Sequence, residues 1–480
     1  MSQLKQKALS GVLWTGLQQF STQGISFIVS IILARLLLPE EFGLIAMIGV
    51  FMGIGAMLMQ AGLGSSLIRT DHPTQEDYST VFFFNLAGSV FMYLLIFLAA
   101  PYIAAFYQQE ILIEIIRWYG SIFIINAFAL VQTTRLTKLL DFKTQLQVSI
   151  PATIFSGIVG VSLAYLGYGV WSLVVMAIAQ AFASALQLWI VAKWQPTWVF
   201  NKQKFQYHFN YGYKLTLSGL LDTLFNNAYV LLIGKFFAPA QVGFYNRADT
   251  LKQLPVGNIG AILGKVTFPL FAAIKNDDIR LKSVYQKIMQ VVVFLVAPTL
   301  LLMAALATPL FRFLFTEKWL PAVPYFQIIC WNGILYPIHS YNLNILKVKG
   351  RSDLFLKLEI LKKVMIAIVI AISFQYGIYG LLYGSVVTSV LTFFINTHYT
   401  GKFLNYTAWE QAKDIVPTII LATFSSALVV VLDLFLQQIR LLDVFRLIIG
   451  GLFGVLLYVF LAFLFKMTAF TELKNLIKKP

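Results

Sequence analysis

A charged segment near the middle of the chain decides how the sequence folds: Gly243-Phe244-Tyr245-Asn246-Arg247-Ala248-Asp249-Thr250-Leu251-Lys252-Gln253-Leu254-Pro255. It lies in a chain of 480 residues that is 59% hydrophobic and 12% charged. Soluble domains carry about 25% charged residues. Either the segment is a loop between membrane helices, or it is a membrane helix that carries charge for a functional reason.

Apolar runs of about 20 residues recur along the chain, which is the pattern of membrane-spanning α-helices. The alternating ten-residue segments of a transmembrane barrel do not occur. The sequence therefore predicts an all-α polytopic membrane protein without a soluble domain. We expect about fourteen spans, at residues 10–37, 42–67, 79–105, 115–136, 145–166, 170–193, 210–236, 241–273, 284–309, 322–346, 355–375, 378–400, 414–436 and 444–466.

Charge fixes the expected orientation. Most of the 36 lysine and arginine residues fall in loops or at span ends on the same side as the two termini, Lys362 among them. Cytoplasmic loops are enriched in these residues, so both termini are expected in the cytoplasm. The net charge of +16 then reflects membrane topology, not nucleic-acid binding. Charged residues near span ends, such as Asp433 and Arg446, are expected at the membrane interface.

Motifs for enzymatic or metal chemistry are missing from the sequence. Cys330 is the only cysteine, which excludes a disulfide framework and a cysteine-based metal site. The four histidines show no metal-binding spacing, and neither HExxH nor GxSxG occurs. We therefore expect no metal, no organic cofactor and no catalytic residue.

The sequence contains an internal repeat. Residues 33–43 and 233–243 share a basic residue, a proline and a glycine in register. Residues 168–171 and 376–379 match in the same order, at nearly the same spacing. The matches predict two six-helix bundles with the same orientation, as in parallel-repeat transporters. The expected domains are residues 1–205 (first bundle), 206–401 (second bundle) and 402–480 (two further spans and a basic cytoplasmic tail).

The repeat places the charged segment in the membrane, at the start of the eighth span. On a helix, Tyr245, Asp249 and Lys252 share one arc, and Asp249 and Lys252 are spaced to pair. Lys252 would lie about 15 Å below the outer end. Arg247 points away from this arc and either snorkels to the outer interface or joins Lys252 as a cation for an anionic substrate. Tyr245 is a further candidate for substrate binding, and Asp249 for ion coupling.

The seventh span carries a polar face formed by Ser218, Asp222, Asn226 and Tyr229. Hydrogen bonding between helices would explain serine and asparagine at such a face. It explains Asp222 poorly, because an acidic side chain in the membrane is costly. Asp222 is therefore a candidate coupling site for H⁺ or Na⁺.

Two other spans carry polar faces. Asn332, Tyr336 and His339 share a face of the tenth span, and Gln18 lies on a polar face of the first. Each face either packs against neighbouring helices or forms hydrogen bonds with a sugar or a head group.

Three motifs resemble a known family: Gly11-Val12-Leu13-Trp14; Ala34-Arg35-Leu36-Leu37-Leu38-Pro39-Glu40-Glu41-Phe42-Gly43; and Leu232-Ile233-Gly234-Lys235 leading to Gly243-Phe244-Tyr245-Asn246-Arg247-Ala248 and Leu254-Pro255. They resemble the polysaccharide-transporter branch of the multidrug/oligosaccharidyl-lipid/polysaccharide exporter (MOP) superfamily. This branch contains Wzx-type flippases similar to colanic acid and teichuronic acid exporters. The resemblance implies a MATE- and MurJ-like fold, with two bundles forming a V around a cationic cavity.

The resemblance also implies a function. Such a protein moves an undecaprenyl-diphosphate-linked oligosaccharide, the repeat unit of a capsule, exopolysaccharide or O-antigen, across the bacterial inner membrane. It works by ion-coupled alternating access, as a monomer among membrane lipids, and serves polysaccharide polymerase and export machinery. Family members often carry an acidic residue where this chain has Tyr229, so either ion coupling has moved to Asp222 or Asp249, or this chain is coupled differently.

Two alternatives remain at this stage. A multidrug or cation antiporter of the same fold would need an acidic cavity, which the basic residues of the eighth span disfavour. A membrane-embedded polymerase or ligase would need a large outer loop, and the expected outer loops are short. No motif identifies the glycan.

Overall fold

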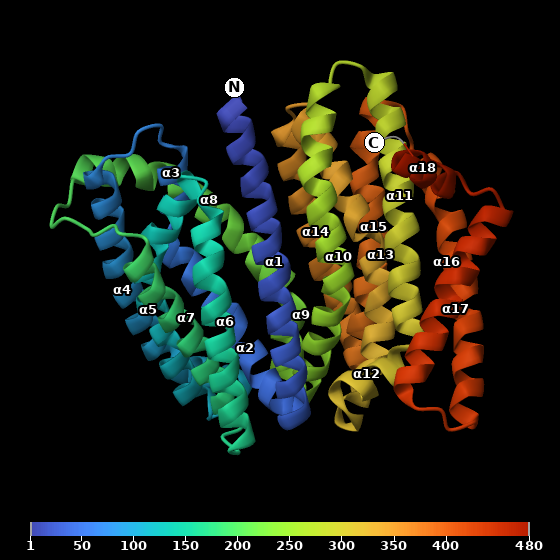
Figure 1. The fold of residues 1–480 in the computed structure, drawn as a ribbon, viewed down its shortest axis with the longest axis horizontal. Coiled ribbons are helices and arrows are strands. Elements are labelled where there is room, and N and C mark those ends of the chain that lie inside the picture. Colours follow the sequence, from blue (N-terminus) through green and yellow to red (C-terminus); the bar gives the residue numbers. More distant parts are fainter. Residues whose placement is uncertain (1, 479–480) are drawn as a thin grey trace. The chain divides into compact units, whose positions relative to one another are not determined.

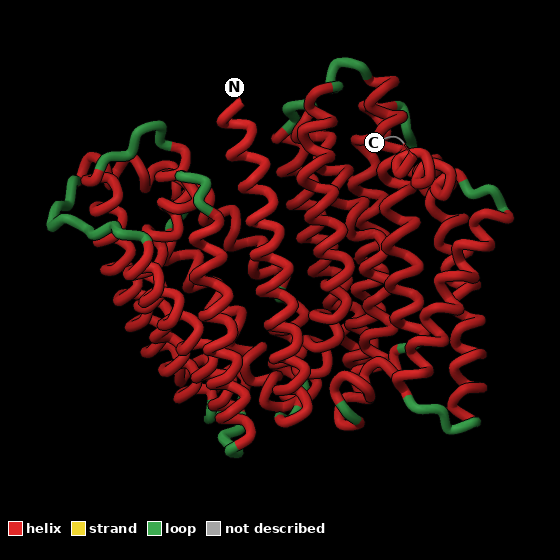
Figure 2. The backbone as a smooth tube through the Cα atoms, viewed as in Figure 1, coloured by secondary structure: helices red, strands yellow, loops and turns green. Residues whose placement is uncertain are grey.

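A computed structural model of the chain describes the backbone of residues 2–478. Side chains are described except at residues 1–13, 214, 215, 218, 221, 260–266, 268, 269, 352 and 475–480. Within these residues every regular element is helical, and no strand occurs (Figure 2). The all-α prediction is therefore confirmed. The chain forms two compact units, which divide between residues 243 and 244.

The first unit is a helical bundle (Figure 1). Its helices are α1 (Ser2–Leu36), α2 (Pro39–Gln60), α3 (Leu63–Arg69), α4 (Gln75–Tyr107), α5 (Leu112–Lys138), α6 (Phe142–Tyr165), α7 (Val170–Val191), α8 (Lys202–Asn226), α9 (Ala228–Phe236) and the start of α10 (Pro239–Ala273). α4 packs along α5, α5 along α7, α7 along α6, and α6 along α1.

Local sequence explains where several helices begin. Pro39 opens α2, where its fixed φ suits the first helical turn. Thr74 caps α4, and the Asp77 carboxylate accepts a hydrogen bond from the Thr74 backbone N–H at 2.7 Å. This reciprocal arrangement is a capping box. It fixes the start of α4 and brings an acidic side chain to that end of the helix.

The expected span at 42–67 is wrong as a single helix. α2 ends at Gln60, and Ala61 and Gly62 then adopt left-handed φ angles of 44° and 66° before α3 begins. A Cβ atom on Gly62 would lie 2.5 Å from the backbone oxygen of Gly212 in α8. Close packing against α8 therefore accompanies the break, and sequence alone did not reveal this tertiary contact.

The expected span at 210–236 is also divided. α8 begins at Lys202, eight residues before the expected start, and ends at Asn226. The Asn227 side chain donates a hydrogen bond to the Thr223 carbonyl oxygen at 2.8 Å. Side chains that hydrogen-bond the backbone in this way compete with helix continuation, and α9 starts anew at Ala228.

The matched repeat residues contact one another at the starts of α2 and α10. A Cβ atom on Gly43 would overlap the carbonyl oxygen of Pro239, and one on Gly243 would overlap that of Pro39. The two glycines thus allow the two helix starts to cross closely, in a reciprocal arrangement. The division into domains at residues 205 and 401 remains a prediction.

The second unit continues α10 and contains the remaining helices (Figure 1). They are α11 (Asp278–Ala305), α12 (Ala307–Phe315), η1 (Glu317–Ala322), α13 (Val323–Val348), α14 (Ser352–Ser373), η2 (Phe374–Tyr376), α15 (Gly377–Leu404), α16 (Ala408–Gln438), α17 (Asp443–Leu464) and α18 (Thr468–Lys478). α13 packs against α11, α14 and α15, and α16 packs against α11 and α17.

Nine helices in the described part of the chain are long and apolar enough to cross a membrane. They are α1 from Trp14 onward, α2, α4, α5, α6, α7, α11, α16 and α17. The other expected spans coincide with α8 and α9, α10, α13, α14 and α15. The protein is therefore a multi-pass membrane protein, and the total of about fourteen spans stays a prediction.

Candidate functional site

The charged segment that opened the sequence is helical throughout, because it lies inside α10. The loop interpretation was therefore wrong. Lys252 follows the first residue of α10 by thirteen positions, which corresponds to about 20 Å along a helix axis. If α10 spans the membrane, its cations lie within the hydrocarbon region.

Arg247 packs against aromatic rings. Its guanidinium carbon lies 4.9 Å from the ring centre of Phe315 and 5.1 Å from that of Trp319. These rings belong to α12 and η1, and Arg247 is only 6% exposed. Cations are attracted to the faces of such rings, more strongly when water is excluded. The side chain is thus held inside the second unit and not extended into solvent.

Lys252 and Asp249 form the ion pair that their spacing predicts. The Lys252 Nζ lies 2.6 Å from Asp249 Oδ1, and Lys252 is 8% exposed. Its methylene groups pass 3.3 Å from the Cβ position of Gly333 on α13. Because a buried ammonium group is costly without a partner, Asp249 stabilises the charged form of Lys252. Tyr245 is half-buried on the same helix.

The polar face of α13 connects to α15. The Ser389 hydroxyl donates to the Asn332 carbonyl oxygen at 3.2 Å and lies 3.2 Å from His339 Nε2. Tyr336, between them in sequence, is 52% exposed. His339 therefore serves helix packing at least in part, Asn332 contributes its backbone oxygen to the contact with α15, and Tyr336 presents its ring to the surface of the unit.

A second buried lysine pair was missed by sequence reasoning. Lys362, which was counted among the basic residues of the cytoplasmic side in the expected span 355–375, lies ten residues into α14 and is 8% exposed. Its Nζ is 2.5 Å from Glu359 Oε1. The available signal was the i,i+3 spacing of glutamate and lysine inside an apolar run.

Two candidate residues belong to the first unit. Gln18 is half-buried on α1, and its backbone oxygen accepts a hydrogen bond from the Thr22 hydroxyl at 2.7 Å. Asp222 is exposed on α8, one turn before the break at Asn227. The break interrupts the expected polar face, and the side chain of Ser218 on that face is outside the described residues.

Asp433 and Arg446, which were expected at the membrane interface, are buried within the second unit. Arg446 donates two hydrogen bonds to Asp433, at 2.9 and 2.7 Å, and a third to Asp443 at 2.9 Å. The exposed fractions are 2% for Arg446 and 6% for Asp433. This bidentate pair joins α16 to α17 and satisfies both charges internally.

The first unit contains a polar cluster at the start of α4. The Asp77 carboxylate accepts from Lys204 Nζ at 2.7 Å and lies 3.3 Å from His208 Nε2, whose Nδ1 is 2.8 Å from Ser66 Oγ. His208 is fully buried, and burial lowers its pKa. The cluster ties α8 to α3 and α4. Among the described residues, no three His, Cys, Asp or Glu side chains gather as metal ligands would.

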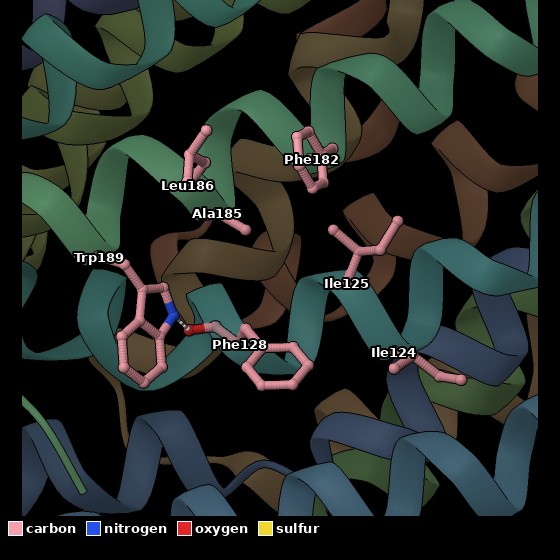
Figure 3. A pocket seen from close by; sticks show the side chains of 7 residues that line it. All are labelled: Ile124, Ile125, Phe128, Phe182, Ala185, Leu186 and Trp189. Atoms are coloured by element: carbon pink, nitrogen blue, oxygen red, sulfur yellow. Dashed lines mark hydrogen bonds between the residues drawn. The ribbon is translucent and has the colours of Figure 1, made fainter.

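The first unit also has two cavities. One, of about 400 Å³, lies between α5 and α7 and is lined by apolar side chains (Figure 3). Trp189 Nε1 donates to the Phe128 carbonyl oxygen at 3.1 Å, so even the indole N–H is satisfied there (Figure 3). The other, of about 280 Å³, includes hydroxyl and amide groups from Thr153, Ser156 and Gln180. Neither cavity is lined by a cation that would bind a diphosphate.

The described architecture is that of a helical membrane protein, and a solved structure has the same fold. The lipid II flippase MurJ, in an inward closed conformation, superposes with a TM-score of 0.74 at 11% identity, covering 97% of this chain and 100% of MurJ. At this identity the match concerns the fold alone. It confirms the predicted MurJ-like fold class.

The sequence identifies the family. Residues 32–324 match the model of the polysaccharide biosynthesis protein family, and the chain belongs to that family. The teichuronic acid biosynthesis protein TuaB of Bacillus subtilis is 25% identical over 74% of each chain. The succinoglycan biosynthesis transport protein ExoT of Rhizobium meliloti is 27% identical over 68% of this chain and 67% of ExoT. The resemblance to polysaccharide transporters is thus confirmed.

Proposed function

We propose that the protein moves an undecaprenyl-diphosphate-linked oligosaccharide from the inner to the outer leaflet of the bacterial inner membrane. The observation that carries the proposal is the Lys252–Asp249 pair, an almost fully buried ammonium group inside α10. Charge inside membrane helices is costly and marks substrate or ion pathways. A cation at this depth suits the diphosphate, the charged group that must cross the hydrocarbon region.

Binding of the diphosphate would exchange the ion-pair partner of Lys252. The diphosphate takes the place of Asp249 beside Lys252, because phosphate oxygens accept strong hydrogen bonds from an ammonium group. Asp249 is then left without its cation in a medium of low dielectric constant, which favours uptake of H⁺ or Na⁺. Ion coupling would follow from this exchange. Arg247, held against Phe315 and Trp319, adds positive potential from the other side of α10.

The polarity of the other parts of the substrate indicates where each part would lie. The polyprenyl chain stays in lipid, and the oligosaccharide contacts neutral polar groups such as Tyr245, Asn332, Tyr336, His339 and Gln18. Alternating access of the two halves moves the head group. We further propose that both termini are cytoplasmic, that the protein acts as a monomer, and that it delivers substrate to a polysaccharide polymerase and export machinery.

A translocation assay tests the proposal. Full-length protein is reconstituted in vesicles with a fluorescent lipid-linked oligosaccharide, and the initial rate of transfer between leaflets is measured. Arg247→Ala and Lys252→Ala should each slow transfer. Lys235→Ala is the matched control. Lys235 lies at the end of α9, and its ammonium group donates a hydrogen bond to the Phe106 carbonyl oxygen of α4. Transfer at the wild-type rate in both α10 variants would remove the diphosphate assignment.

Restored resistance to cationic drugs in a host without its own pumps would favour the antiporter alternative instead.

A further inference from the structure

The cavity of about 280 Å³ inside the first unit has a polar wall formed by three helices. Ser26 and Ser30 line it from α1, Thr153 and Ser156 from α6, and Gln180 from α7. Each of these helices is long and apolar enough to cross a membrane. Polar groups in such surroundings are costly without partners, so the hydrogen bonds of these side chains indicate what the cavity can hold.

Gln180 uses only half of its hydrogen-bonding capacity within the described residues. The Ser156 hydroxyl donates to the Gln180 side-chain oxygen, and Gln180 Nε2 donates to Thr153 Oγ1 at 3.3 Å. An amide side chain has two N–H donors and an oxygen with two lone pairs. One N–H and one lone pair therefore remain. The bonds that are made hold α7 to α6, and the adjacent cavity leaves room for a ligand at the other two positions.

The cavity becomes apolar toward one end. Leu33, Phe42 and Leu173 line it near the end of α1 and the starts of α2 and α7. Leu33 and Leu173 belong to one buried apolar cluster, and Phe42 packs against that cluster. Gln180 lies further along α7, near its middle. A ligand in the cavity would therefore meet both hydrogen-bonding groups and hydrocarbon.

This lining excludes several classes of ligand. Among the described residues that line the cavity none is charged, so neither a phosphate group nor a cation would find a counter-charge. A purely apolar ligand would leave the spare groups of Gln180 without partners, which is costly in a dry site. A sugar ring carries hydroxyls at its edge and has an apolar C–H face, so it matches both parts of the lining.

The size of the cavity limits how much sugar it can take. Pockets for drug-sized ligands measure about 300–1,000 Å³. A cavity of about 280 Å³ has room for one ring and not for a whole oligosaccharide.

We propose that this cavity is a subsite for one neutral sugar ring, and that Gln180 is its specificity-determining residue. The free N–H and the free lone pair of the Gln180 amide bond two hydroxyls of the ring, and the C–H face of the ring packs on Phe42. The ring belongs to the lipid-linked oligosaccharide, and this last assignment rests on the proposed function.

Saturation-transfer NMR on the full-length protein in nanodiscs tests the subsite, with the methyl glycosides of glucose, galactose and N-acetylglucosamine as probes. At least one of the three should bind. Gln180→Leu should weaken its binding at least about tenfold, because about two neutral hydrogen bonds are lost. Gln187→Leu is the matched control: Gln187 lies on the same helix but is not among the residues that line the cavity, so this variant should bind like the wild type.

A second variant tests the cavity without removing a polar group. Ala177 lines the cavity, and Ala177→Leu places a larger side chain there. Binding of the glycoside should weaken although every hydrogen-bonding group remains. Midpoints of thermal unfolding check that each variant is folded. If Gln180 served only to hold α7 to α6, neither the wild type nor any variant would bind a glycoside.

The outcomes separate this proposal from the proposed function. If the wild type binds none of the three glycosides, or if Gln180→Leu and Gln187→Leu bind equally well, the subsite is overturned, even if the wild type moves lipid-linked oligosaccharide. The expected variant pattern in a protein that moves no oligosaccharide would support the subsite and reject the proposed function. In a protein that does move it, the bound glycoside should slow transfer, and an unchanged rate would overturn the assignment of the subsite to the substrate.

Discussion

The Asp433–Arg446 pair gives the most quantitative stability prediction. Arg446→Met leaves the Asp433 carboxylate buried at 6% exposure without its two donors. Breaking a buried pair from one side costs about 3–5 kcal/mol. Replacing both partners by apolar residues, as in Asp433→Leu with Arg446→Met, should cost far less, because no charge is left buried. The two substitutions should therefore be strongly non-additive.

A double-mutant cycle measures this coupling. The free energy of unfolding of the full chain is determined in detergent for the wild type, both single variants and the double variant. Arg312→Met is a suitable control, since the Arg312 side chain is 32% exposed and lies 3.5 Å from Asp443. A surface pair of this kind contributes about 1 kcal/mol or less. If Arg446→Met destabilises the protein no more than Arg312→Met, the buried-pair interpretation is wrong.

Three further predictions concern the first unit. Gly43→Ala should destabilise the protein by at least about 2 kcal/mol, because the new Cβ would overlap the backbone of Pro239. Gly49→Ala, with open space around the new Cβ, should not destabilise it. Equal midpoints of thermal unfolding for the two variants would contradict this. Burial lowers the pKa of His208, so the unfolded state binds the proton more readily and stability should fall as pH drops below about 6.5. His208→Asn should flatten this fall in unfolding midpoint, and an unchanged profile would refute it. The hydroxyls of Ser79 on α4 and Thr197, in the segment that joins α7 to α8, lie 3.0 Å apart. A disulfide in the double variant Ser79→Cys/Thr197→Cys should leave transport intact, because this segment belongs to the first unit. If oxidation stops transport reversibly, the segment must separate from α4 during transport.

Hydropathy was enough to predict the helical class and most helix positions, because apolar runs of membrane length leave the backbone few alternatives. The breaks at Ala61–Gly62 and Asn227 were not predicted. Both lie within long runs that read as single spans, and the first depends on contact with Gly212, 150 residues away. Pairwise contacts of this kind leave no periodic signal in a single sequence.

The candidate site was predicted in part. The i,i+3 spacing correctly paired Asp249 with Lys252, because helix geometry alone determines that contact. The same rule applied to Glu359 and Lys362 in the expected span 355–375, but Lys362 was counted only as a basic residue of the cytoplasmic side, so the pair was missed. The aromatic partners of Arg247 and the contact between Ser389 and His339 come from distant helices, so they required the three-dimensional structure.

The most direct test of the proposed function is the rate at which Lys252 variants transfer lipid-linked oligosaccharide between leaflets in vesicles. The double variant Asp249→Asn/Lys252→Met removes both charges of the pair and so leaves no unpaired carboxylate on α10. It should slow transfer at least about tenfold, a loss of about 1.4 kcal/mol, whereas Lys252→Arg should retain most of the rate and Thr250→Ala, at an exposed position of α10, all of it. Transfer by the double variant at the wild-type rate would contradict the role of Lys252 as the cation for the diphosphate.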